Sequence, residues 1–118
     1  MDERDEHFFE DIARSIDGWA EAAVDGLRDP ASSSHEGKAA LATLAAAVRT
    51  PEQRKAFEAV VRETLTGLAH SIMVTLDGGS AYADRLGSPR LLHGDGHPFV
   101  DGLHEWLFDH LIRTGRLT

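Results

Sequence analysis

Apolar residues recur at intervals of three and four along most of the chain, which is the spacing of one helix face. This pattern predicts helices over residues 3–28, 36–49, 51–76 and 100–113. The segment 51–76 has the most regular stripe, which consists of Phe57, Val61, Leu65, Leu68, Ile72 and Leu76. We therefore predict an all-α fold, a compact four- to five-helix bundle with this segment as its central helix.

Residues that cap or break helices mark the ends of these segments. Thr50, Pro51 and Gln53 have the order of a capping box, and Gly78 suits the left-handed turn that ends a helix. Residues 29–37 form a Ser-rich loop in this interpretation. Residues 80–86 fit a short helical turn, and the Asp-Gly pair inside residues 90–97 is compatible with a minor β-hairpin as well as with a loop.

The chain of 118 residues predicts a single helical domain over residues 1–118. Its net charge of −8 argues against nucleic acid as a partner and favours a soluble protein that attracts basic protein surfaces. The absence of cysteine excludes disulfides and thiolate sites. With an acidic N-terminus and no apolar run of about 20 residues, we expect a cytoplasmic protein that does not enter a membrane.

The candidate chemistry lies in the C-terminal half. Asp101 and His104 are three residues apart on one helix face, and His70 projects from the preceding long helix. If the two helices pack together, His70, Asp101 and His104 are candidate ligands of a divalent zinc, iron or manganese ion. The alternative is that Asp101 caps its helix and His104 forms a hydrogen bond across an interface.

His70 and Asp77 are seven residues apart, or about 10 Å along a helix, so they cannot easily share one ion. Apolar Met73 and Val74 beside His70 favour a packed imidazole, whereas a solvated stripe is the alternative. His93 and His97 flank the Asp-Gly pair, and a turn explains them better than a metal site does. We expect no cofactor beyond a possible divalent metal.

Known catalytic motifs are absent. The zinc-protease pattern fails because Phe108 stands where a second histidine is needed, and the chain contains no phosphate loop, dinucleotide fingerprint or nucleophile elbow. We therefore lean against an enzyme.

Large aromatic residues suggest an interaction surface. If Leu103, Trp106 and Leu107 face inward, Phe108 and Ile112 lie on another face and expose apolar area, as in a protein interface or a homodimer. Burial beneath the segment 77–98 is the alternative.

The string His70-Ser71-x-x-Val74-x-Leu76-Asp77-Gly78-Gly79, followed by Gly102-Leu103-His104-Glu105, resembles a pattern in small uncharacterised bacterial helical proteins. The resemblance covers the C-terminal half. That group has no established activity, so the resemblance implies no mechanism. It does single out His70, Asp77, His104 and Glu105 as positions to test.

The leading hypothesis is a non-enzymatic protein-interaction module, either immunity- or antitoxin-like against a basic partner or a homodimer. The alternative is a metal-binding bundle or metal-dependent enzyme that uses His70 and His104 with nearby carboxylates. A small-ligand pocket lined by His70 and Trp106 is a third possibility. The candidate binding site consists of His70, Asp77, His104, Glu105 and Trp106.

Overall fold

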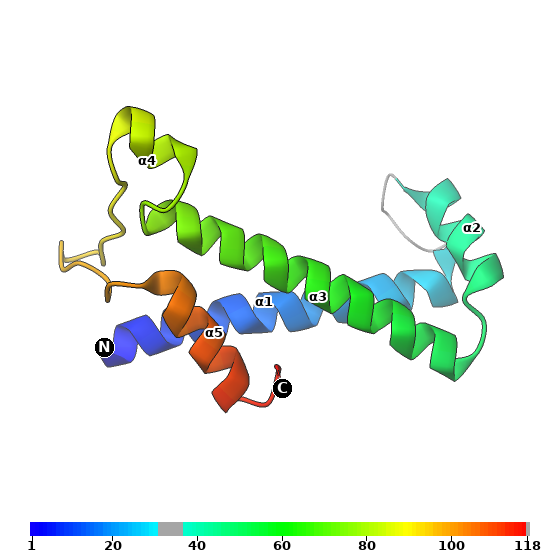
Figure 1. The fold of residues 1–118 in the computed structure, drawn as a ribbon. Helices are drawn as coiled ribbons and strands as arrows, with labels where there is room; N and C mark the ends of the chain where they lie inside the picture. Colours follow the sequence, from blue (N-terminus) through cyan, green and yellow to red (C-terminus); the bar gives the residue numbers. More distant parts are fainter. Residues whose placement is uncertain (31–36, 118) are drawn as a thin grey trace. The chain divides into compact units, whose positions relative to one another are not determined.

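The structure is a computed structural model that describes residues 1–30 and 37–117. Within these residues it contains helices and no strand (Figure 1). The helices are α1 (Glu3–Arg28), α2 (Lys38–Ala47), α3 (Pro51–Leu76), α4 (Ala81–Leu86) and α5 (Leu103–Arg113). The all-α helical fold is confirmed. Most of the predicted loop 29–37 falls on residues 31–36, outside the described residues.

The predicted ends of α3 are confirmed. The N–H of Gln53 donates to Oγ1 of Thr50 at 3.1 Å, and Oε1 of Gln53 accepts the N–H of Thr50 at 3.0 Å. This reciprocal pair is a capping box. At the other end Gly78 has φ +83°, a conformation that glycine adopts without strain.

The segment between α3 and α5 contains α4 and a hairpin-like turn. The turn has one isolated antiparallel bridge between Leu92 and Pro98, and the N–H of His93 donates to the carbonyl of His97 at 2.8 Å. Gly96 at the turn has φ +88°. The N–H of Phe99 donates to the carbonyl of Leu91 at 3.1 Å on the other side of this bridge, and the predicted minor hairpin is limited to these contacts.

Contacts between helices divide the chain into two compact units. Unit 1 consists of Met1–Arg14 and Thr66–Thr118, and unit 2 consists of Ser15–Leu65. The long helices α1 and α3 contribute to both units.

The core of unit 1 is formed by α1, α3 and α5. Its buried members are Phe9, Ala13, Met73, Leu103, Leu107 and Leu111. Phe8 adds an edge-on ring contact with Phe99, with centroids 4.9 Å apart. Each fully buried large side chain stabilises the fold by about 1.5–3 kcal/mol. Because these core residues pack together, α5 lies beside the N-terminal part of α1 (Figure 1).

Two sequence-based expectations about unit 1 are wrong. α5 begins at Leu103 rather than near residue 100, because Gly102 precedes it in a left-handed conformation with φ +79°. On α3, Leu68 and Ile72 are exposed, whereas Met73 is the buried residue. The helices of unit 1 cover the face of α3 that carries Ala69 and Met73, so part of the apolar stripe stays outside the core.

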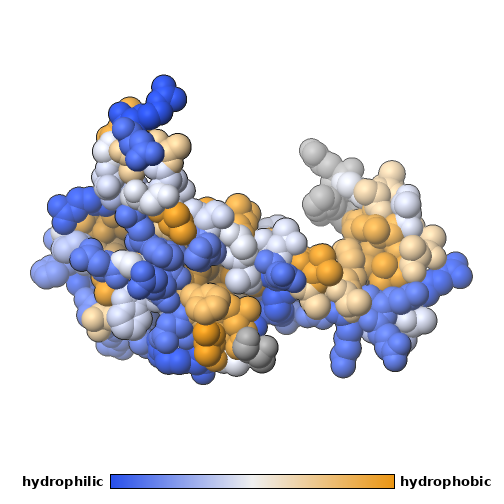
Figure 2. Space-filling view, in the orientation of Figure 1, coloured by the Kyte–Doolittle hydropathy of each residue, from blue (hydrophilic) through white to orange (hydrophobic). Residues whose placement is uncertain are grey.

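Unit 2 has fewer buried hydrophobic residues than unit 1, and in the described part of the unit all of them lie on one helix. Its buried hydrophobic residues, all on α1, are Ile16, Ala20, Val24 and Leu27. α2 has no buried residue. An ion pair between Asp17 of α1 and Arg62 of α3 joins these two helices. Figure 2 shows hydrophobic colouring over much of the α2 surface.

No helix in the described part of the chain is both long enough and apolar enough to span a membrane.

Candidate functional site

Asp77, the residue after α3, binds the first turn of α5. Its Oδ1 accepts the N–H of Leu103 at 2.8 Å, and its Oδ2 accepts the N–H of His104 at 2.9 Å. The first N–H groups of a helix have no partner inside the helix, so Asp77 serves as the cap of α5. The N-cap residue itself, Gly102, has no side chain to do so. The interpretation of Asp101 as the cap is therefore wrong.

The same carboxylate holds the His104 ring. Oδ2 of Asp77 lies 2.5 Å from Nδ1 of His104. Burial raises the pKa of Asp77, but the hydrogen bonds from His104 and Leu103 outweigh burial and lower the pKa below its ordinary value. Asp77 is thus a carboxylate at neutral pH and can only accept hydrogen bonds. The proton between the two groups belongs to Nδ1, which leaves Nε2 of His104 as the ring nitrogen that Asp77 does not hold.

His70 of α3 and Glu105 of α5 lie around this ring. The His70 and His104 rings meet edge to face, with centroids 5.5 Å apart. Oε1 of Glu105 lies 3.8 Å from Nε2 of His104. His70 is exposed rather than packed, despite its apolar neighbours. We call His70, Asp77, His104 and Glu105 the histidine cluster.

The other two predicted site residues form no hydrogen bond, ion pair or ring contact with this cluster within the described part of the chain. Trp106 is half-buried against the core of unit 1, and Asp101 is exposed just before α5. Among the described residues, one group of three possible metal ligands has its ligand atoms within 4.8 Å of one another, and that group is Asp2, Asp5 and His93. The ligand atoms of His70, Asp101 and His104, the combination predicted from sequence, do not all lie within 4.8 Å of one another.

A cavity of about 470 Å³ opens beside Asp77 and His104. Leu91, Phe99 and Val100 give it an apolar wall, and Arg90 and Asp101 stand at its polar side. This volume lies within the range of small-ligand pockets. His70 and Trp106, which the sequence suggested as lining residues, do not line it.

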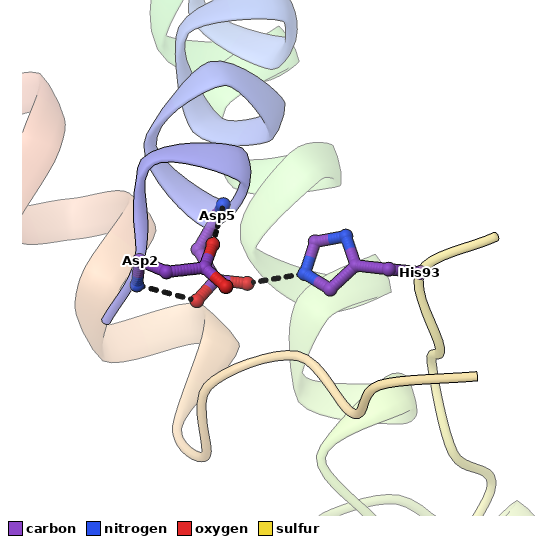
Figure 3. Close-up of side chains that lie close together, drawn as sticks. All are labelled: Asp2, Asp5 and His93. Atoms are coloured by element: carbon purple, nitrogen blue, oxygen red, sulfur yellow. Dashed lines mark hydrogen bonds and ion pairs between the residues drawn. The ribbon is translucent and has the colours of Figure 1, made fainter. Parts of the chain in front are cut away.

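The group of Asp2, Asp5 and His93 is a structural junction (Figure 3). Oδ1 of Asp2 accepts the N–H groups of Arg4 and Asp5, and Oδ2 of Asp5 accepts the N–H of Asp2. Oδ1 of Asp5 lies 2.8 Å from Nε2 of His93, and both side chains are buried. The His93 ring also stacks on Phe99 at 3.7 Å. Capping of α1 and a buried ion pair account for all of these contacts.

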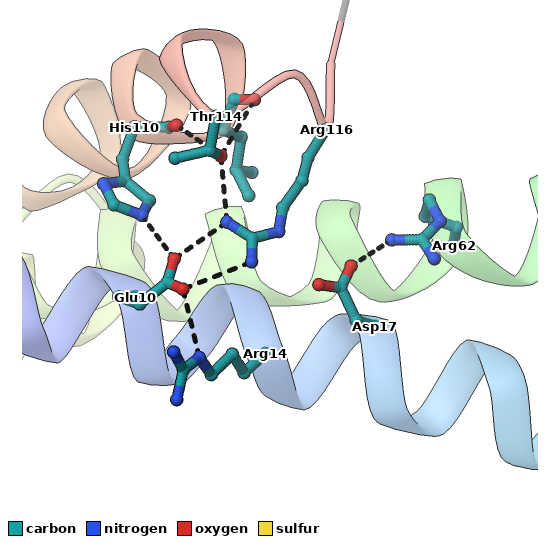
Figure 4. Close-up of polar contacts among 8 residues, drawn as sticks. Glu10, Arg14, Asp17, Arg62, His110, Thr114 and Arg116 are labelled. Atoms are coloured by element: carbon teal, nitrogen blue, oxygen red, sulfur yellow. Dashed lines mark hydrogen bonds and ion pairs between the residues drawn. The ribbon is translucent and has the colours of Figure 1, made fainter.

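A second junction joins α1 to the C-terminal residues (Figure 4). Oε1 of Glu10 lies 2.9 Å from Nε2 of buried His110 and accepts Nη1 of Arg116 at 2.8 Å. Hydrogen bonds from Arg116 first, and then from His110, lower the pKa of Glu10 to about 2. Nδ1 of His110 is buried and has no hydrogen-bond partner among the described residues. This junction anchors the end of the chain on α1.

Sequence reasoning did not find these two junctions. Asp5 and His93 are 88 residues apart, and Glu10 and His110 are 100 residues apart. His110 falls on the same helical face as Leu103 and Leu107, and this spacing was the one available signal, because a buried imidazole needs a polar partner.

The exposed apolar surface forms a different kind of candidate site. α2 has the sequence KAALATLAAA, in which eight of ten residues are Ala or Leu, yet none is buried. Elsewhere in unit 2, Trp19 is 66% exposed and Val60 is also exposed. In unit 1, Phe108 and Ile112 are exposed, as the face of α5 predicted. These side chains resemble the residues of an interface more than those of a solvated surface.

No protein-family model, curated protein or solved structure matches this chain.

Proposed function

We propose that the chain is a non-enzymatic protein-interaction module that associates with a second copy of itself through unit 2. The observation that carries this proposal is α2, whose residues are nearly all apolar and none of which is buried. A helix that is hydrophobic around its whole circumference is normally buried. The described part of unit 2 covers α2 on one side only, so a partner surface is the natural cover of the rest.

Small side chains suit α2 to close helix packing. Six of its ten residues are alanine, which lets another backbone approach closely. Leu41 contacts Gly26 of α1, at 3.4 Å from the position that a Cβ there would take, so one side of α2 packs within its own chain. Leu44 is exposed and available to a partner. The helix is thus held on one side and uncovered on another.

The charge distribution favours a second copy over a basic partner at this surface. Unit 1 contains twelve acidic and six basic residues, whereas unit 2 contains eight acidic and six basic ones. The only charged residue of α2 is Lys38. Two acidic chains repel each other least where acidic side chains are fewest. An acidic surface that masks a basic toxin would instead place its carboxylates at the contact.

The test compares two substitutions of exposed leucines by size-exclusion chromatography with light scattering. We expect a dimer for the wild-type chain and a monomer for Leu44→Glu, because the glutamate would bring charge into the apolar contact. Leu86→Glu is the matched control, since Leu86 on α4 is also exposed but belongs to unit 1. We expect it to remain dimeric.

Circular dichroism should show equal helix content in all three proteins. A dimer that persists in Leu44→Glu, or a wild-type chain that is monomeric at every concentration, would refute self-association through α2.

A further inference from the structure

We propose that His70, His104 and Glu105 bind one divalent transition-metal ion of the zinc class at the junction of α3 and α5, with Asp77 orienting His104. This site is independent of self-association, because all four residues belong to unit 1. It differs from the set expected from sequence by having Glu105 in place of Asp101.

The contact with Asp77 fixes which ring nitrogen of His104 carries its proton. The Asp77 carboxylate accepts the proton of Nδ1, with 2.5 Å between the two heavy atoms. A neutral imidazole that donates from Nδ1 has its lone pair on Nε2, the form that binds metal ions. Metal-binding histidines commonly donate their second N–H to a carboxylate, which fixes the ring and raises its basicity. Asp77 and His104 already have this arrangement.

The distance between the His70 and His104 rings suits two ligands of one metal ion. Two imidazoles on one tetrahedral zinc ion, each bound at about 2.0–2.1 Å, have ring centroids roughly 5 Å apart. The centroids of His70 and His104 are 5.5 Å apart. The ligand atoms of His70, His104 and Glu105 do not all lie within 4.8 Å of one another, so the exposed His70 side chain would have to rotate to direct one of its nitrogens at the same ion.

Glu105 lies near Nε2 of His104 and can supply a third ligand. Its Oε1 lies 3.8 Å from Nε2 of His104, close to the spacing of neighbouring ligand atoms around zinc. The Glu105 side chain is 80% exposed, so a change of rotamer disturbs no packing. Two imidazoles and one carboxylate, with a position left for water, form a known zinc ligand set.

The junction of Asp2, Asp5 and His93 is the competing metal site, and the hydrogen bonds argue against it. Nε2 of His93 is already paired with Asp5, and both Asp2 oxygens accept hydrogen bonds from Arg4 or from Asp5. A metal there would have to displace the cap of α1. In the histidine cluster, the carboxylate nearest Nε2 of His104 is that of Glu105, which lies 3.8 Å away and is exposed.

The test is titration of the full chain with Zn²⁺ in a calorimeter. We expect one ion per chain, and loss of that binding in His70→Ala, His104→Ala and Glu105→Gln. His70 and Glu105 are exposed, so those two variants should fold normally. His97→Ala, which removes an exposed histidine outside the cluster, should bind like wild type. Asp77→Asn should bind roughly 10- to 100-fold more weakly.

A second readout is the visible absorption of bound Co²⁺, which reports tetrahedral coordination. Binding should also weaken in acid, because protons compete with the metal ion for its ligands. The proposal is overturned if wild type binds no zinc, if His70→Ala retains wild-type affinity, or if His97→Ala is the variant that loses binding.

Discussion

At the scale of single residues, unit 1 is joined by three histidine–carboxylate pairs. They are Asp5 with His93, Asp77 with His104, and Glu10 with His110. Each pair links segments that are distant in sequence, and each has at least one partner that is half-buried or buried. Hydrogen bonds to charged groups stabilise more than neutral ones, about 1.5–3 kcal/mol each. The folded protein lowers the pKa of Asp77 and of Glu10, so acid weakens the pairs that these two carboxylates form.

Glu10 gives the clearest prediction of pH dependence. Its pKa is about 2 in the folded protein, against an ordinary value of 4.5. The folded state therefore gains stability from the Glu10 carboxylate above about pH 4.5, and loses it as the pH falls toward 2. We expect Glu10→Gln to lower the free energy of unfolding by about 1–3 kcal/mol at neutral pH and to have little effect near pH 2.

Urea unfolding over a series of pH values measures this difference. Glu21→Gln, at an exposed position of the same helix, is the control and should change stability little at any pH. A difference between wild type and Glu10→Gln that stays constant down to pH 2 would contradict the assigned role of Glu10.

The sequence was enough to single out the residues of the histidine cluster, but not to assign the role of each. Helical spacing placed His70, Asp77 and His104 on the two helices that meet there. The function of Asp77 as a cap depends on how α3 and α5 pack, and Asp77 is 26 residues before Leu103. No local pattern encodes a cap that comes from another helix.

At the scale of helices, two glycines test the boundaries of α5 and the interior of α3. Gly102 precedes α5 with φ +79°, so alanine there should destabilise the protein by about 1–2 kcal/mol. Gly67 lies inside α3 with open space around its Cβ position, so alanine there should stabilise by about 0.5–1 kcal/mol. Thermal unfolding should shift in opposite directions for the two variants. Stabilisation by Gly102→Ala would contradict the left-handed boundary of α5, and destabilisation by Gly67→Ala would contradict the open space around Gly67.

The helices themselves follow from sequence more fully than their buried faces do. The capping box at Thr50 and the glycine at the end of α3 act within one turn, so local chemistry defines these ends. The prediction that the apolar stripe of α3 faces the core is wrong at Leu68 and Ile72, which are exposed. The spacing of apolar residues specifies an apolar face but not how much of it another helix covers.

At the scale of the whole molecule, the net negative charge is divided unevenly between the two units. Most of the net negative charge belongs to unit 1, and the uncovered apolar helix belongs to unit 2. An apolar contact responds little to salt, whereas association led by opposite charges weakens as salt rises. Salt dependence therefore distinguishes self-association through α2 from binding of a basic partner.

The most direct test of self-association is sedimentation equilibrium of the untagged chain at low and at high salt. We predict a mass of twice the 12.9 kDa chain, unchanged or slightly raised by added salt because screening reduces repulsion between acidic copies. A single-chain mass at both salt concentrations would contradict the proposal. So would a dimer that dissociates as salt rises, because its contact would then depend on opposite charges rather than on the apolar surface of α2.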